Sequence, residues 1–128
     1  VPFLHIADAV AKEAISRGDS KLMLLGTKFT CQEDFYRQRL ESHGLEVLIP
    51  RDNEIAEIHR FIYTKLKTGS FPDSANERFR EIVLSFEKSV GSIVLACTEL
   101  PLLLGNEIPD TCLDTIELHC QAIMDYKF

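Results

Sequence analysis

The sequence predicts an α/β domain with a parallel sheet of four or so strands, flanked by helices on both faces. Short apolar runs typical of fully buried strands alternate with longer segments in which apolar residues recur at helical spacing. Glycine or proline stands at several of the boundaries between them. The chain has 128 residues, 45% hydrophobic and 27% charged. A chain of this length buries about two-thirds of its unfolded surface, so a single independent core is feasible.

The elements follow from these patterns in order along the chain. Residues 7–17 show helical spacing and stop before Gly18, and a buried strand is expected at 22–25. Thr30 is a plausible N-cap for the next helix, which Gly44 ends. The remaining elements are expected as helix 32–43, strand 45–49, helices 52–67 and 73–88, a strand ending at Ala96, a short helix, an extended piece near Leu113, and a helix from Thr115 to about Tyr126.

Composition narrows the classes of function. The net charge of −6 and the lack of a basic patch argue against nucleic-acid binding. No apolar run approaches the roughly 20 residues of a membrane helix, and no signal-peptide pattern is present, so a cytoplasmic location without membrane contact is expected. The four cysteines lack a Cys-x-x-Cys pattern, which indicates neither a metal site nor a disulfide framework.

The most informative candidate for chemistry is Cys97, which directly follows the apolar run 92–96. Pro101 and the leucines after it predict a helix just beyond, so Cys97 is expected at a corner between a strand and a helix. Unpaired amides at a helix N-terminus favour thiolate over thiol, and we expect Cys97 to be the most acidic of the four thiols. A buried structural cysteine is the alternative.

A second polar cluster, 26–30, follows the strand at 22–25. Ligands of parallel sheets bind beyond the carboxyl ends of the strands, where this cluster and Cys97 are both expected. Thr27 and Thr30 offer hydroxyls and nearby amides to a substrate carboxylate, although Thr30 has the alternative role of a helix cap. Thr98 is a further donor. Glu99 would orient a substrate amine or poise the thiol, or simply favour the helix N-terminus.

The segment 96–103, Ala-Cys-Thr-Glu-Leu-Pro-Leu-Leu, resembles the second active-site cysteine motif of the aspartate/glutamate racemase superfamily. Glu99 stands where glutamate racemases tend to carry histidine, so the aspartate racemase branch is the better match. The resemblance covers almost the whole chain in collinear order. Its other segments are 2–8, 25–30, 34–36, 47–50, 59–63 and 114–119.

The resemblance implies one lobe of a two-lobed fold, because the first cysteine motif of the family has no counterpart here. We interpret the chain as the C-terminal half, with a crossover segment and helix at 1–20, the lobe itself at 21–104, and a strand and helix at 105–128 that pack on the other lobe. Apolar residues near both ends would lack their partner, so we expect the ends to pack on each other, to associate as a homodimer, or to be mobile. These residues are Phe3, Ile6, Ile116, Ile123 and Tyr126.

The resemblance also implies a cofactor-independent racemase acting on an acidic amino acid, with Cys97 as one of two opposed thiols. No pyridoxal phosphate is expected, since no lysine has a cofactor-binding context. In the family, a lysine from about the region of Lys67 is associated with acidic substrates. The alternative is that Lys67 is simply a solvated lysine at a helix end. His59 and His119 are interpreted as structural. Open alternatives are a maleate isomerase, decarboxylase or hydantoin racemase, and an inactive module that binds small anions or forms an interface.

Overall fold

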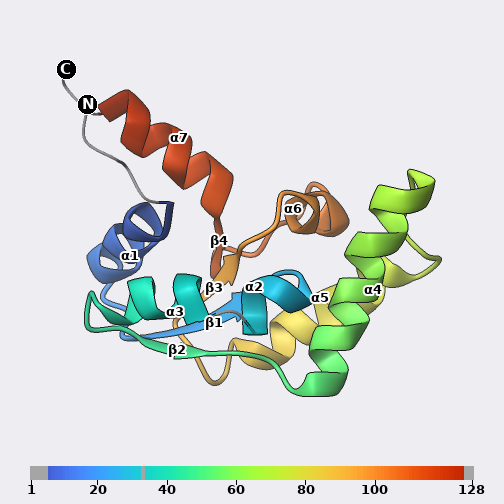
Figure 1. The fold of residues 1–128 in the computed structure, drawn as a ribbon, viewed down its shortest axis with the longest axis horizontal. Helices are drawn as coiled ribbons and strands as arrows, with labels where there is room; N and C mark the ends of the chain where they lie inside the picture. The colour runs from blue at the N-terminus through green and yellow to red at the C-terminus, as the bar shows by residue number, and fades with distance from the viewer. Residues whose placement is uncertain (1–5, 33, 126–128) are drawn as a thin grey trace.

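The computed structural model describes residues 6–32 and 34–125, and it confirms the predicted fold class (Figure 1). Four parallel strands form one sheet in the order β2-β1-β3-β4. The elements are α1 (Ile6–Ser16), β1 (Lys21–Leu25), α2 (Lys28–Gln32), α3 (Asp34–Glu41), β2 (Glu46–Leu48), α4 (Asp52–Thr68), α5 (Ala75–Phe86), β3 (Ser92–Leu95), α6 (Glu99–Leu104), β4 (Cys112–Asp114) and α7 (Thr115–Asp125).

Helices cover the sheet on both faces, which explains why the central strands are continuous apolar runs. Alternate residues of β1 and β3 point to opposite faces and join two separate cores. Met23 and Leu25 pack with α4, α5 and α6, whereas Leu22 and Leu24 pack with α1 and α3. Figure 1 shows the corresponding division, with α1 and α3 on one side and α4 and α5 on the other.

The expected helix at 32–43 is wrong in its start. The chain enters α2 immediately after β1, and α3 follows as a second helix. The Thr27 hydroxyl accepts a hydrogen bond from the Thr30 backbone amide at 3.3 Å, so Thr27 precedes and caps α2. Thr30 lies inside α2 and does not have the expected N-cap role. The end predicted near Tyr126 lies outside the described residues.

The C-terminal strand is an integral part of the sheet. β4 pairs in parallel with β3, so the boundary expected after residue 104 does not divide the sheet. α7 then packs against α1. The expected contact of segment 1–6 with the C-terminal segment falls almost entirely outside the described residues. Ile116 and Ile123 each remain 43% exposed on α7. Phe3 and Tyr126, expected to share this apolar surface, lie outside the described residues.

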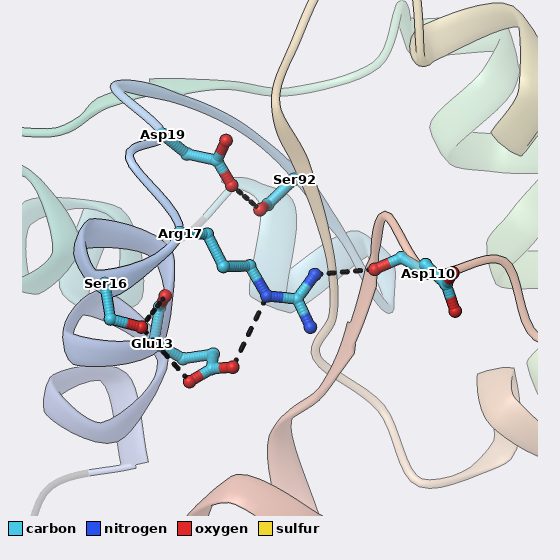
Figure 2. A network of polar contacts seen from close by, with 6 residues as sticks. All are labelled: Glu13, Ser16, Arg17, Asp19, Ser92 and Asp110. Atoms are coloured by element: carbon cyan, nitrogen blue, oxygen red, sulfur yellow. Dashed lines mark hydrogen bonds and ion pairs between the residues drawn. The ribbon is translucent and has the colours of Figure 1, made fainter.

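A polar network fastens the amino end of the sheet (Figure 2). The Ser92 hydroxyl at the start of β3 donates to the Asp19 carboxylate in the segment before β1. Neighbouring Gly91 is required here, because a β-carbon would collide with that carboxylate. Arg17 donates to the Asp110 carbonyl oxygen at 2.6 Å and thereby joins α1 to the segment before β4. These contacts lie at the edge opposite the carboxyl ends of the strands.

Within residues 6–32 and 34–125, every helix falls short of the length or the apolar character that crossing a membrane requires.

Asp8 links α1 to α3 and makes the free energy of unfolding depend on pH. Its carboxylate accepts two hydrogen bonds from the Arg39 guanidinium at 2.8 Å and lies 2.7 Å from His43 Nε2. The hydrogen bonds from Arg39, helped by His43, hold the pKa of the Asp8 carboxyl well below its usual range. A depressed pKa in the folded state stabilises the protein above the unfolded pKa of about 4, and this stabilisation declines as pH falls further.

We therefore expect Asp8→Asn to lower the free energy of unfolding by about 1 kcal/mol at pH 7. The difference from wild type should shrink between pH 4 and pH 2. Urea unfolding at each pH measures it. Asp34→Asn is the control, because Asp34 pairs only within α3 with Arg37 and is largely exposed. An equal gap at pH 7 and pH 2 would contradict the assignment to Asp8.

Candidate active site

The strand order places a topological switch point between β1 and β3. The chain leaves β1 toward β2 on one side, and β3 lies on the other side of β1. The connections diverge at such a point, and the carboxyl ends of the two strands border the usual ligand crevice of an open α/β sheet. The Ala96 amide donates to the Leu25 carbonyl oxygen at 2.8 Å, which extends the pairing to the last residue before Cys97. Gly26 and Cys97 thus follow adjacent strand ends.

The turn after β1 is tightly built. A β-carbon on Gly26 would lie 3.0 Å from Cβ of Thr30, so only glycine fits here without displacing that side chain. The hydroxyls of Thr27 and Thr30 are 3.1 Å apart and both side chains are half-buried. The structure therefore brings the two predicted threonines together, at the predicted edge. Beneath them, the buried Cys31 thiol donates to the Leu24 carbonyl oxygen at 3.7 Å.

Cys97 lies at the expected corner after β3. Its side chain is half-buried, and its carbonyl oxygen accepts the Leu100 amide at 3.1 Å at the start of α6. Thr98 is exposed, has helical backbone angles and makes no side-chain capping bond. Glu99 is the first residue of α6 and is half-buried.

Burial opposes the thiolate character that the sequence predicts for Cys97. Burial raises the pKa of the Cys97 thiol, the Glu99 backbone amide lowers it only in part, and the Glu99 carboxylate raises it further. Burial also raises the pKa of Cys31 to about 11 and that of Cys112 to about 12. Cys120 is exposed on α7. Burial thus favours the protonated form of the Cys97 thiol in this lobe.

His59 on α4 also lies at this edge, although the sequence analysis did not assign this residue to the site. Its Nδ1 accepts the Lys28 backbone amide at 3.0 Å, at the first residue of α2. The half-buried imidazole stacks on Tyr63 with ring centroids 6.0 Å apart. His59 is thus hydrogen-bonded, as expected, but it lies against the turn that carries Thr27. The sequence signal for this contact was a histidine among isoleucines on one face of a helix.

Lys67 lies two helical turns after His59 on α4. Its Nζ is 5.9 Å from the centre of the Tyr63 ring. Among the described residues, no hydrogen bond or ion pair joins Lys67 to Thr27, Thr30 or Cys97. Thr27, Thr30 and Cys97 therefore follow two adjacent strand ends, whereas Lys67 is exposed on α4 and is not joined to them.

The carboxyl end of β4 completes the edge. The buried Thr115 hydroxyl donates to the Leu95 carbonyl oxygen at 3.1 Å, and the Asp114 carboxylate accepts the Ile116 amide at 3.0 Å to begin α7. Burial raises the pKa of the Tyr36 phenol, with an opposing effect from Thr115. Across the described ranges, no three His, Cys, Asp or Glu side chains gather as a metal ion would require.

Two crystal structures resemble the chain closely. A candidate Asp/Glu racemase from Yersinia pestis has a TM-score of 0.88 and 37% sequence identity, over 98% of this chain and 56% of that one. An aspartate racemase homologue from Pyrococcus horikoshii has a TM-score of 0.84 and 36% identity, with the same coverage of 98% and 56%. The Picrophilus torridus aspartate racemase, at 22% identity, shares the fold with a TM-score of 0.71 over 95% of this chain and 52% of that one.

Residues 1–123 match the sequence model of the Asp/Glu/Hydantoin racemase family. A solved structure with 37% sequence identity also aligns with 98% of this chain. The chain therefore belongs to this family. It spans about half the length of these solved relatives, 56% in the first two.

The contribution of the Glu99 carboxylate to the pKa of Cys97 can be tested. Glu99→Gln removes a negative charge that raises the thiol pKa, so the pKa should fall and the thiolate fraction at pH 8 should rise. We expect iodoacetamide to modify Cys97 about twofold to fivefold faster in this variant, as read by mass spectrometry. Glu117→Gln on α7 is the matched control. Slower modification of Cys97 in Glu99→Gln would refute this electrostatic account.

Proposed function

We propose that the chain is one lobe of a cofactor-independent racemase of the aspartate/glutamate type. The observation that carries the proposal is the position of Cys97 at the β1–β3 switch point, beside the Gly26–Thr27 turn. A thiol and a carboxylate-binding turn at one edge are what proton transfer at the α-carbon of an amino acid requires. Membership of the Asp/Glu/Hydantoin racemase family supports the same activity.

The proposed reaction uses two thiols on opposite faces of the α-carbon. A partner thiolate, outside this lobe, removes the α-hydrogen as a proton and becomes a thiol. Cys97 donates its proton to the opposite face of the same carbon and becomes a thiolate, so protons and charge balance and the configuration inverts. The raised pKa of Cys97 fits the protonated, donating member of the pair. Both groups must remain reduced, which fits a cytoplasmic location.

The substrate is proposed to be an acidic amino acid held through its carboxylates. Thr27, Thr30 and Thr98 supply hydroxyls near the thiol, and hydrogen-bond donors aimed at the α-carboxylate stabilise the charge that develops in the carbanion-like transition state. Glu99 is proposed to attract the α-ammonium group. Lys67 is proposed to attract the side-chain carboxylate of the substrate.

Substrate protection of Cys97 tests this proposal. L-Aspartate should slow the alkylation of Cys97 and leave that of exposed Cys120, the internal reference, unchanged. L-Asparagine should protect less, because it lacks the second carboxylate, and L-lysine should not protect. Equal rates at Cys97 with and without aspartate would contradict the proposal. Protection by maleate or a hydantoin instead would assign the site to another reaction of the wider superfamily.

Lys67→Gln provides the specificity control. It should reduce protection by aspartate to the level given by asparagine, whereas Lys65→Gln should not, because Lys65 donates to the Gly69 carbonyl oxygen at 2.8 Å and caps the helix end. Racemisation by the chain alone is expected to be at trace level, since one thiol cannot serve both faces of the α-carbon. Robust inversion would show that a second base is already supplied.

We also propose that a second lobe or a second copy covers α7. Ile116 and Ile123 are each 43% exposed and Met124 is 81% exposed, on the helix that follows the edge strand. If copies of this chain associate through α7, sedimentation should show a concentration-dependent dimer, and Ile116→Asp with Ile123→Asp should abolish it. Leu84→Asp on α5, also about half exposed, is the control. A monomeric wild-type chain would exclude self-association at α7.

A further inference from the structure

We propose that His59 is a positioning residue, which holds the Gly26–Thr27–Lys28 turn in the form that presents its hydroxyls and amides to a substrate carboxylate. The contact crosses between elements, because His59 lies on α4 and Lys28 begins α2. The inference rests on the proposed function of this edge, but the turn itself can be tested without any substrate.

The turn depends on support from outside α2. This helix has only five residues, and an isolated helix of that length is unstable in water. Thr27 and Thr30 fix the turn from within, and Gly26 permits the close approach of Thr30. His59 supplies the one described side-chain acceptor for the Lys28 amide, which has no carbonyl partner inside α2. Without His59, the turn would lose its direct hydrogen bond to the long helix α4.

The geometry also fixes the state of the ring. Nδ1 accepts a hydrogen bond, so this nitrogen carries no proton and the proton of the ring is on Nε2. The Tyr63 ring stacks on the His59 imidazole, with 6.0 Å between the ring centroids, and supports its orientation.

Two variants separate the hydrogen bond from packing. His59→Asn retains an acceptor oxygen near the position of Nδ1 and cannot titrate, whereas His59→Leu fills similar space without an acceptor. The readouts are the hydrogen exchange and chemical shift of the Lys28 amide, followed by NMR at one fixed pH. We expect exchange at Lys28 to be about twofold to tenfold faster in His59→Leu. His59→Asn should restore slow exchange.

His43→Asn is the matched control, because His43 pairs with Asp8 on the opposite face and should leave Lys28 unchanged. The affinity for L-aspartate, read from shifts at Gly26 and Thr27, should fall in His59→Leu and recover in His59→Asn. If His59→Leu does not fold, the Lys28 amide in His59→Asn decides, since slow exchange supports the inference and fast exchange overturns it.

The inference is overturned if the Lys28 amide behaves as wild type in His59→Leu, if its exchange stays fast in His59→Asn, or if aspartate affinity is unaffected while Lys28 responds. If no variant and no wild-type protein binds aspartate, the proposed function fails. The positioning of the turn by His59 is then judged by the amide measurements alone.

Discussion

The parallel pairing of β1 with β3 is the interaction on which the rest of the structure depends. Their register, from Leu22 opposite Ser92 to Leu25 opposite Leu95, aligns the two carboxyl ends at one edge. Both strands are buried on both faces, and a shift by one residue would exchange the side chains of the two cores. The same register therefore secures the hydrophobic packing and places the Gly26 turn beside Cys97.

The geometry of this edge depends on both local and distant contacts. Thr27 and Thr30 organise the turn locally, within one helical turn of sequence. The bond from Lys28 to His59 instead spans 31 residues and makes the turn depend on how α4 packs. Burial at Cys97 adds a third influence, because it keeps the thiol protonated although a backbone amide approaches it. The opposite edge of the sheet is held by the hydrogen bond between Ser92 and Asp19 and contains none of these three contacts.

Much of the fold could be predicted because buried parallel strands and amphipathic helices leave strong periodic patterns. The threonine cap was misplaced because both Thr27 and Thr30 suit a helix start, and the sequence does not reveal that α2 begins directly after β1. The opposing effect of burial on Cys97 could not be predicted, because a helix start is a local pattern, whereas burial is a property of the whole fold. His59 was placed on an apolar face, and its partner at Lys28 is distant in sequence.

The central claim is that the β1–β3 edge binds the carboxylates of an acidic amino acid within reach of Cys97. A crystal structure of the chain with bound L-aspartate tests it most directly. The account predicts the α-carboxylate at the Gly26–Thr27 turn and the α-carbon facing the Cys97 sulfur. Aspartate bound instead in the hollow of about 450 Å³ lined by Arg17, Asp110 and Glu117, with the β1–β3 edge empty, would contradict it.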